Sequence, residues 1–146
     1  MQTPSKTETI LTTMVSVLGT LSNVTIARNS AVPEKIPSAG LIILRDGTAD
    51  EPEQPLGGFG GVYCRQDAEI EIYVENGDAA ARDAAFDSLL EQIGSVLDAD
   101  PTLGGLAFGL TYSRPEIDTE AVIGGPAIKA GTLIVAVEFE ADTALG

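Results

Sequence analysis

Apolar positions recur along this chain with two periods, which predict two helices and several strands. Near the N-terminus they are spaced three and four apart, typical of one buried helix face. The residues are Ile10, Leu11, Met14, Val15, Leu18 and Leu21. Two starts are open for this helix: Thr3 with Pro4 in the first turn, or Ser5, which forms a capping box with Glu8. Gly19 marks its end. A second stripe predicts another helix, with Asp78 as its N-cap. It comprises Phe86, Leu89, Leu90, Ile93, Val96 and Leu97.

Alternating or continuous apolar runs elsewhere predict strands. Val24 and Ile26 indicate a short strand, and residues 41–44 are apolar throughout, as expected of a strand buried on both faces. From Val62 to Glu75 apolar and polar residues alternate, which predicts a long strand with one wet face. A strand is expected from Leu106 to Tyr112, followed by a late hairpin. The hairpin strands are Ala121–Ile123 and Leu133–Val137, around a turn region at 124–131.

This order of elements predicts an α+β fold with a mostly antiparallel sheet and two main helices packed on one face. The 146 residues suit one domain spanning 1–146. A chain of this length buries about 68–70% of the surface that its unfolded form exposes, so no metal or disulfide is needed to stabilise it.

The composition changes sharply between Asp46 and Gly61. This stretch holds Asp46, Asp50, Glu51 and Glu53, no Lys or Arg, and ends in a glycine-rich run. It is predicted to be a long, mobile, acidic loop that serves as a contact arm. Residues 113–131 are a second candidate for contacts at the rim of an assembly.

The net charge narrows the possible partners, and the single cysteine excludes an internal disulfide. The formal net charge is −14, with 22 acidic and 8 basic residues, which disfavours binding to nucleic-acid phosphates or anionic membranes. Cys64 is the only cysteine, so no internal disulfide is possible, and it is expected to be a small buried hydrophobe. No signal peptide pattern or apolar run of membrane-spanning length is present, which predicts a cytoplasmic product without a membrane segment.

The chemical inventory favours a protein that is not an enzyme and holds no cofactor or metal. There is no histidine, which removes the commonest catalytic and metal-binding arrangements. The acidic loop has oxygen ligands for Ca²⁺ but not the spacing of an EF-hand. Glu69 and Glu71 are conceivable as an acid/base couple. The alternative is that both are solvated carboxylates on one face of a strand. An acyl-transfer enzyme using Cys64 would lack a base beside the thiol.

The run from Asp100 to Leu106 forms a sharp corner in the chain. Pro101 ends the preceding helix, and Gly104 and Gly105 permit positive φ angles, so the chain can reverse into a strand. With the strand and acidic exit at 41–47 and the ending at 135–139, this corner resembles the tail terminator and tail completion family of long-tailed bacteriophages and phage-derived gene-transfer particles. The resemblance spans most of the chain, and the corner at 97–106 is its specific part.

The resemblance implies a structural virion protein. Such proteins form a ring, expected to be hexameric, that caps the completed tail tube, stops its polymerisation and joins the tail to the head connector. Expected partners are other copies of the chain, the tail tube protein and the connector or stopper protein, with DNA passing through the lumen without specific binding. Assembly is expected in the host cytoplasm, and the final position at the head-proximal end of the virion tail. A head-side neck protein of related fold and a small acidic protein-binding module are the alternatives.

Two sets of residues are predicted to serve this assembly. The first consists of exposed apolar groups near loops and of cations that offset the negative charge at contacts. It is expected at subunit or tube interfaces: Arg28, Arg45, Leu56, Phe59, Tyr63, Arg65, Tyr112, Arg114, Ile117 and Lys129. The second set is expected on an acidic surface facing the lumen or the tube: Asp50, Glu51, Glu53, Glu69, Glu71 and Glu75.

Overall fold

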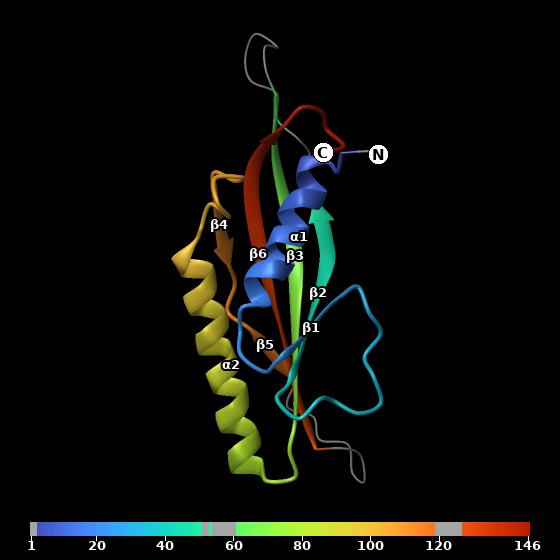
Figure 1. The fold of residues 1–146 in the computed structure, drawn as a ribbon, viewed down its shortest axis with the longest axis vertical. Helices are drawn as coiled ribbons and strands as arrows, with labels where there is room; N and C mark the ends of the chain where they lie inside the picture. The colour runs from blue at the N-terminus through green and yellow to red at the C-terminus, as the bar shows by residue number, and fades with distance from the viewer. Residues whose placement is uncertain (1–2, 51–52, 54–60, 119–126) are drawn as a thin grey trace.

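The computed structural model describes residues 3–50, 53, 61–118 and 127–146, and it is an α+β fold (Figure 1). The elements, in chain order, are α1 (Lys6–Leu18), β1 (Thr25–Arg28), β2 (Leu41–Ala49), β3 (Val62–Glu75), α2 (Ala79–Ala99), β4 (Gly109–Tyr112), β5 (Glu116–Asp118) and β6 (Ile128–Ala141). The sheet order is β1-β2-β3-β6-β4, and β5 also pairs with β6. Only the β1–β2 pair is parallel among the described strands, so the predicted mostly antiparallel sheet is confirmed.

Both helices begin at the predicted caps. The Ser5 hydroxyl oxygen accepts a hydrogen bond from the Glu8 N–H at 3.1 Å, and an Asp78 carboxylate oxygen accepts one from the Ala81 N–H at 3.0 Å. These bonds satisfy backbone donors that have no partner within the first turn of a helix. Gly19 caps the C-terminal end of α1, as expected.

The centre of the sheet is the long antiparallel pair β3–β6. It runs in unbroken register from Val62 opposite Ala141 to Glu75 opposite Ile128. Because side chains alternate along a strand, the even-numbered residues of β3 and the odd-numbered residues of β6 face the helices. Ile70 and Val135 are completely buried on this face.

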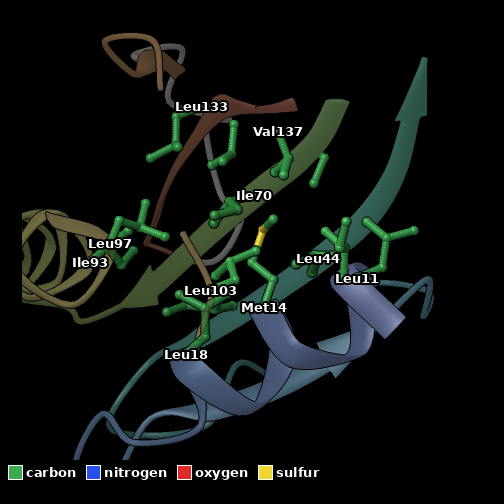
Figure 2. Packing of buried hydrophobic residues seen from close by; sticks show 14 of the residues in the cluster. Leu11, Met14, Leu18, Leu44, Ile70, Ile93, Leu97, Leu103, Leu133 and Val137 are labelled. Carbon is green, nitrogen blue, oxygen red and sulfur yellow. The ribbon is translucent and has the colours of Figure 1, made fainter. Parts of the chain in front are cut away.

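Both helices pack on this one face of the sheet, and their stripes form a single core with it. Figure 2 shows Met14 and Leu18 of α1 beside Leu103, with Ile93 and Leu97 of α2 next to them. The buried stripes therefore have the role that their spacing predicts.

Strand β2 is buried on both faces, also as predicted. Ile42 and Leu44 belong to the core beneath the helices. Leu41 and Ile43 point to the other face, where they form a second, smaller cluster with Ile36 from the loop between β1 and β2. This loop therefore covers part of the sheet face opposite the helices.

The predicted acidic loop begins later than expected. Asp46 and the residues up to Ala49 belong to β2, with an irregularity in the pairing after Asp46. The buried Gln66 side chain donates a hydrogen bond to the Gly47 carbonyl oxygen at 3.1 Å, which helps hold this distorted section. Acidic composition did not prevent strand formation here because Asp46 pairs with an arginine on β1.

The corner at residues 100–106 has the predicted geometry, but the strand after it begins at Gly109 instead of Leu106. Leu103, Gly104 and Gly105 have positive φ angles of 51°, 71° and 91°. The turn extends further than expected because the N–H groups of Leu106 and Ala107 donate hydrogen bonds back to the carbonyl oxygens of Leu103 and Thr102, at 3.4 and 3.0 Å. The Leu103 side chain is buried in the core, where it is 1% exposed.

Strand β5 pairs with β6, with Glu116 opposite Thr132. The turn region predicted at 124–131 is wrong for residues 128–131, which belong to β6 because they continue its pairing with β3. The strand predicted at 121–123 lies outside the described residues.

Candidate assembly surfaces

The sheet face opposite the helices, which we call the open face, carries the odd-numbered side chains of β3 and the even-numbered side chains of β6. It is rich in carboxylates from these two strands: Asp67, Glu69, Glu71, Glu75, Glu138 and Glu140. From the same strands the only cation on it is Arg65, which lies near Asp50 and Asp67 at 3.5 and 3.6 Å. The three predicted lumen residues of β3, Glu69, Glu71 and Glu75, thus share one acidic face.

The open face is less exposed to solvent than the alternation of apolar and polar residues predicted, because the loop between β1 and β2 covers part of it. The Arg45 Nε donates a hydrogen bond to Glu71 at 2.6 Å, and its Nη2 donates to the Ser30 carbonyl oxygen at 2.8 Å. Further along, a Glu75 carboxylate oxygen accepts a hydrogen bond from the Ile36 N–H at 3.1 Å. Two of the predicted lumen residues therefore help fix the loop between β1 and β2, and Arg45 is used within the chain.

The same network shifts two ionisation equilibria. Burial raises the pKa of Glu71, but hydrogen bonds from Arg45 and Tyr73 favour the carboxylate and bring the pKa below its usual value. Burial, followed by the hydrogen bond to Glu71 at 2.6 Å, raises the pKa of Tyr73 to about 12.

These shifts give a pH dependence with a defined sign. Because the pKa of Glu71 is lower in the folded state, its stabilising contribution is complete above the unfolded value and is lost as pH falls through the folded value. We expect Glu71→Gln to lose stability at neutral pH and to depend less on pH in the acidic range than the original protein. Urea unfolding of both proteins at neutral and acidic pH measures this. Equal slopes of stability against pH would contradict the prediction.

Other predicted interface cations also have partners within the chain. Arg28 binds Glu8 of α1 and Asp46 of β2, which joins the helix to the sheet edge. The Lys129 Nζ lies 3.2 Å from an Asp83 carboxylate oxygen and 5.0 Å from the centre of the Phe86 ring. Their proposed use between subunits stays a prediction, and any such use must compete with these contacts.

The predicted interface residues Tyr63, Tyr112 and Ile117 lie in different parts of the described structure. Tyr63 stacks on Phe108 with a ring-centre separation of 5.9 Å, and its hydrogen bond to Glu138 raises the pKa of its hydroxyl. Tyr112 is 41% exposed and its hydroxyl donates a hydrogen bond to Asp98 of α2 at 2.9 Å. Ile117 of β5 is also 41% exposed. Phe108, which is 60% exposed, is an apolar surface group that the sequence analysis missed.

A groove between α2 and the β4–β5 connection was also missed from the sequence. It has a volume of about 300 Å³ and is mainly apolar, with Leu90 and Gly94 of α2 facing Tyr112 and Pro115, and Arg114 and Glu91 beside them. The one available signal was a glycine inside a helical pattern, which is unfavourable for a helix unless something requires it.

The remaining predictions concern single residues. Cys64 is buried and unpaired, and burial raises its thiol pKa, so the described environment gives it no activation. Glu53 is exposed and pairs with Tyr63 through backbone hydrogen bonds of 2.7 and 2.9 Å. Glu51, Leu56 and Phe59 lie outside the described residues.

The described residues contain no group of three or more Cys, Asp or Glu side chains placed to hold a metal ion. Over the same part of the chain, neither helix is both long enough and apolar enough to cross a membrane.

Comparison with known proteins gives similarities at the level of structure. No family model and no curated protein matches the sequence. One similar solved structure is from the virion of a native gene transfer agent particle, with a TM-score of 0.42, 15% identity, and coverage of 87% of this chain and 84% of that one. Another is the PVC sheath/tube terminator of an extracellular contractile injection system in the extended state, with a TM-score of 0.47 and 9% identity. That match covers 98% of this chain and 58% of the other, so this chain spans less than two thirds of its length.

Because the TM-scores are below 0.5, the functional proposal rests on the residues of the chain itself.

Proposed function

We propose that this chain is a structural subunit that assembles with copies of itself into a ring at the end of a tail tube, ends tube growth and joins the tube to a connector. The observation that carries the proposal is the acidic open face of the sheet, taken with the corner motif at residues 97–106 that resembles tail terminators. In a ring of six, a face of this kind turned towards the lumen repels DNA phosphates and lets DNA pass without binding.

The edges of the sheet support the self-association. The sheet ends in β1 on one side and in β4 and β5 on the other, and these strands have only three or four residues. A closed ring requires two different surfaces of one subunit to meet, and the two edges provide two such surfaces. Short edge strands are also a common way to limit uncontrolled pairing between sheets.

Electron microscopy of the purified chain, alone and with tail tubes of the same particle, tests the proposal. We expect rings on the ends of the tubes, and tubes of limited length when the chain is present during their growth. Tubes that grow equally long with and without the chain would contradict the terminator role. Rings attached to heads and absent from tubes would favour the head-side neck protein.

A second version of this experiment tests the role of the charge. Glu69 lies on the open face without an ion pair among the described residues. We expect Glu69→Lys to leave ring formation intact but to slow DNA delivery by assembled particles, since the lumen would attract phosphates. Asp87→Lys is the matched control for net charge, because Asp87 is exposed on α2 and is not among the residues that line the groove. Delivery equal to that of the control would contradict a lumen position of the open face.

A further inference from the structure

Gly94 occupies an unusual position in α2. Glycine in the interior of a helix is less favourable than alanine, and packing within the subunit does not require it here. A Cβ atom built on Gly94 would meet only the Tyr112 hydroxyl oxygen, at an ordinary contact distance of 3.7 Å. The missing side chain leaves open the floor of the groove between α2 and the β4–β5 connection. The groove therefore has the form of a receptor site for another side chain.

The opposite edge of the sheet presents an apolar side chain that fits this description. Val32 lies in the loop between β1 and β2 and is 42% exposed. The loop is fixed on both sides of Val32: Arg45 holds the Ser30 carbonyl, and Ile36 is buried and hydrogen bonded to Glu75. A side chain held in this way loses little conformational freedom on binding, which favours association.

Charges beside the two surfaces are complementary. The loop carries Glu34 and Lys35 next to Val32, and the groove carries Arg114 and Glu91 beside its apolar floor. All four are exposed, and none makes an ion pair with another described residue. Glu34 can thus meet Arg114 while Lys35 meets Glu91.

The two surfaces lie too far apart to meet within one subunit. The loop leaves the β1–β2 edge of the sheet, and the groove is lined mainly by residues of α2 and of the β4–β5 connection, at the other end of the order β1-β2-β3-β6-β4. Figure 1 shows the loop and these elements on opposite sides of the sheet. A contact between them joins two subunits through different surfaces, so each subunit can accept one neighbour and donate to the next.

We infer that Val32 of one subunit inserts into the Gly94 groove of a second copy, with Glu34 on Arg114, and that this head-to-tail contact propagates the assembly. The inference rests on the proposed ring and specifies the surfaces that form it. It also gives Arg114, which was predicted as an interface residue, a defined partner.

Cross-linking of full-length chains tests this contact even where association is weak. One chain carries Val32→Cys, a second carries Gly94→Cys, and the two are mixed with a short bismaleimide. We expect a cross-linked dimer from the mixture and only background from either chain alone, because Cys64 is buried. In a chain that carries both substitutions we expect a ladder of larger species. The matched control replaces Gly94→Cys by Ser95→Cys, which is exposed on the next position of α2.

Charge reversal separates a specific contact from random collision. We expect Glu34→Arg in the Val32→Cys chain to lower the yield about two- to fivefold, and Arg114→Glu in the Gly94→Cys chain to restore it. A yield with Ser95→Cys equal to that with Gly94→Cys, or no rescue by the second reversal, would overturn the inference.

The outcome also separates this contact from the proposed function. Rings seen by electron microscopy without cross-linking between positions 32 and 94 would overturn the contact and leave the proposed function standing. Absence of both rings and cross-linked species would overturn the contact together with the proposed ring.

Discussion

Replacing Phe86 with alanine is expected to lower the free energy of unfolding by about 3–5 kcal/mol. The Phe86 side chain is 1% exposed and lies where α2 packs on the sheet. A Cβ atom on Gly131 of β6 would approach its ring to 2.7 Å, so the strand backbone lies directly against the ring. Because the surroundings are fixed by the β3–β6 pairing, they cannot close the cavity that the substitution leaves.

Urea unfolding followed by circular dichroism measures this effect. Phe108→Ala is the matched control, since Phe108 is 60% exposed and its main described ring contact is the stack on Tyr63. We expect that control to cost about 0.5–1.5 kcal/mol. Equal losses for the two variants would show that α2 does not pack on the sheet through Phe86.

Replacing Gly40 with alanine is expected to lower the free energy of unfolding by about 1–3 kcal/mol from its backbone conformation alone. Its φ angle is 102°, which residues with a side chain rarely adopt. A Cβ atom would also approach the Leu89 Cδ1 to 2.9 Å, so the buried Leu89 side chain would have to move. Gly40 joins the loop that carries Val32 to β2, and its carbonyl oxygen accepts a hydrogen bond from the Thr25 N–H at 3.1 Å.

Gly77→Ala provides the control for this prediction. A Cβ atom there meets nothing within 4 Å and the backbone has no positive φ angle, so its stability is expected to change by less than about 1 kcal/mol. The comparison uses the midpoint of thermal unfolding. A variant at position 40 as stable as the one at position 77 would contradict the positive φ angle of Gly40.

Local patterns in the sequence predicted the elements well and the contacts between them poorly. The caps at Ser5 and Asp78, the two helix stripes and the alternation of Val62–Glu75 each depend on residues close together in the chain, and all are confirmed. The extension of β2 through Asp46 was missed because its carboxylate is neutralised by Arg28, which arrives from another strand. Acidic composition alone predicted a loop there.

The candidate surfaces show the same difference between local patterns, which the sequence predicts, and contacts between elements, which it does not. Alternation placed Glu69, Glu71 and Glu75 on one face, but only the register with β2 shows that Arg45 and the loop cover Glu71. Gly94 is recognised as part of a groove only because β4 places Tyr112 opposite it. No pattern within α2 contains that information.

The long pairing of β3 with β6 has a mechanical consequence. Fourteen residues of extended chain cover about 46 Å at roughly 3.3 Å per residue. Rows of backbone hydrogen bonds, independent of side-chain identity, therefore set the separation between the two ends of the subunit. Substitutions on either face of the β3–β6 pair can therefore change the surface that the subunit presents to its partners, while the distance between the two ends of the pair stays constant.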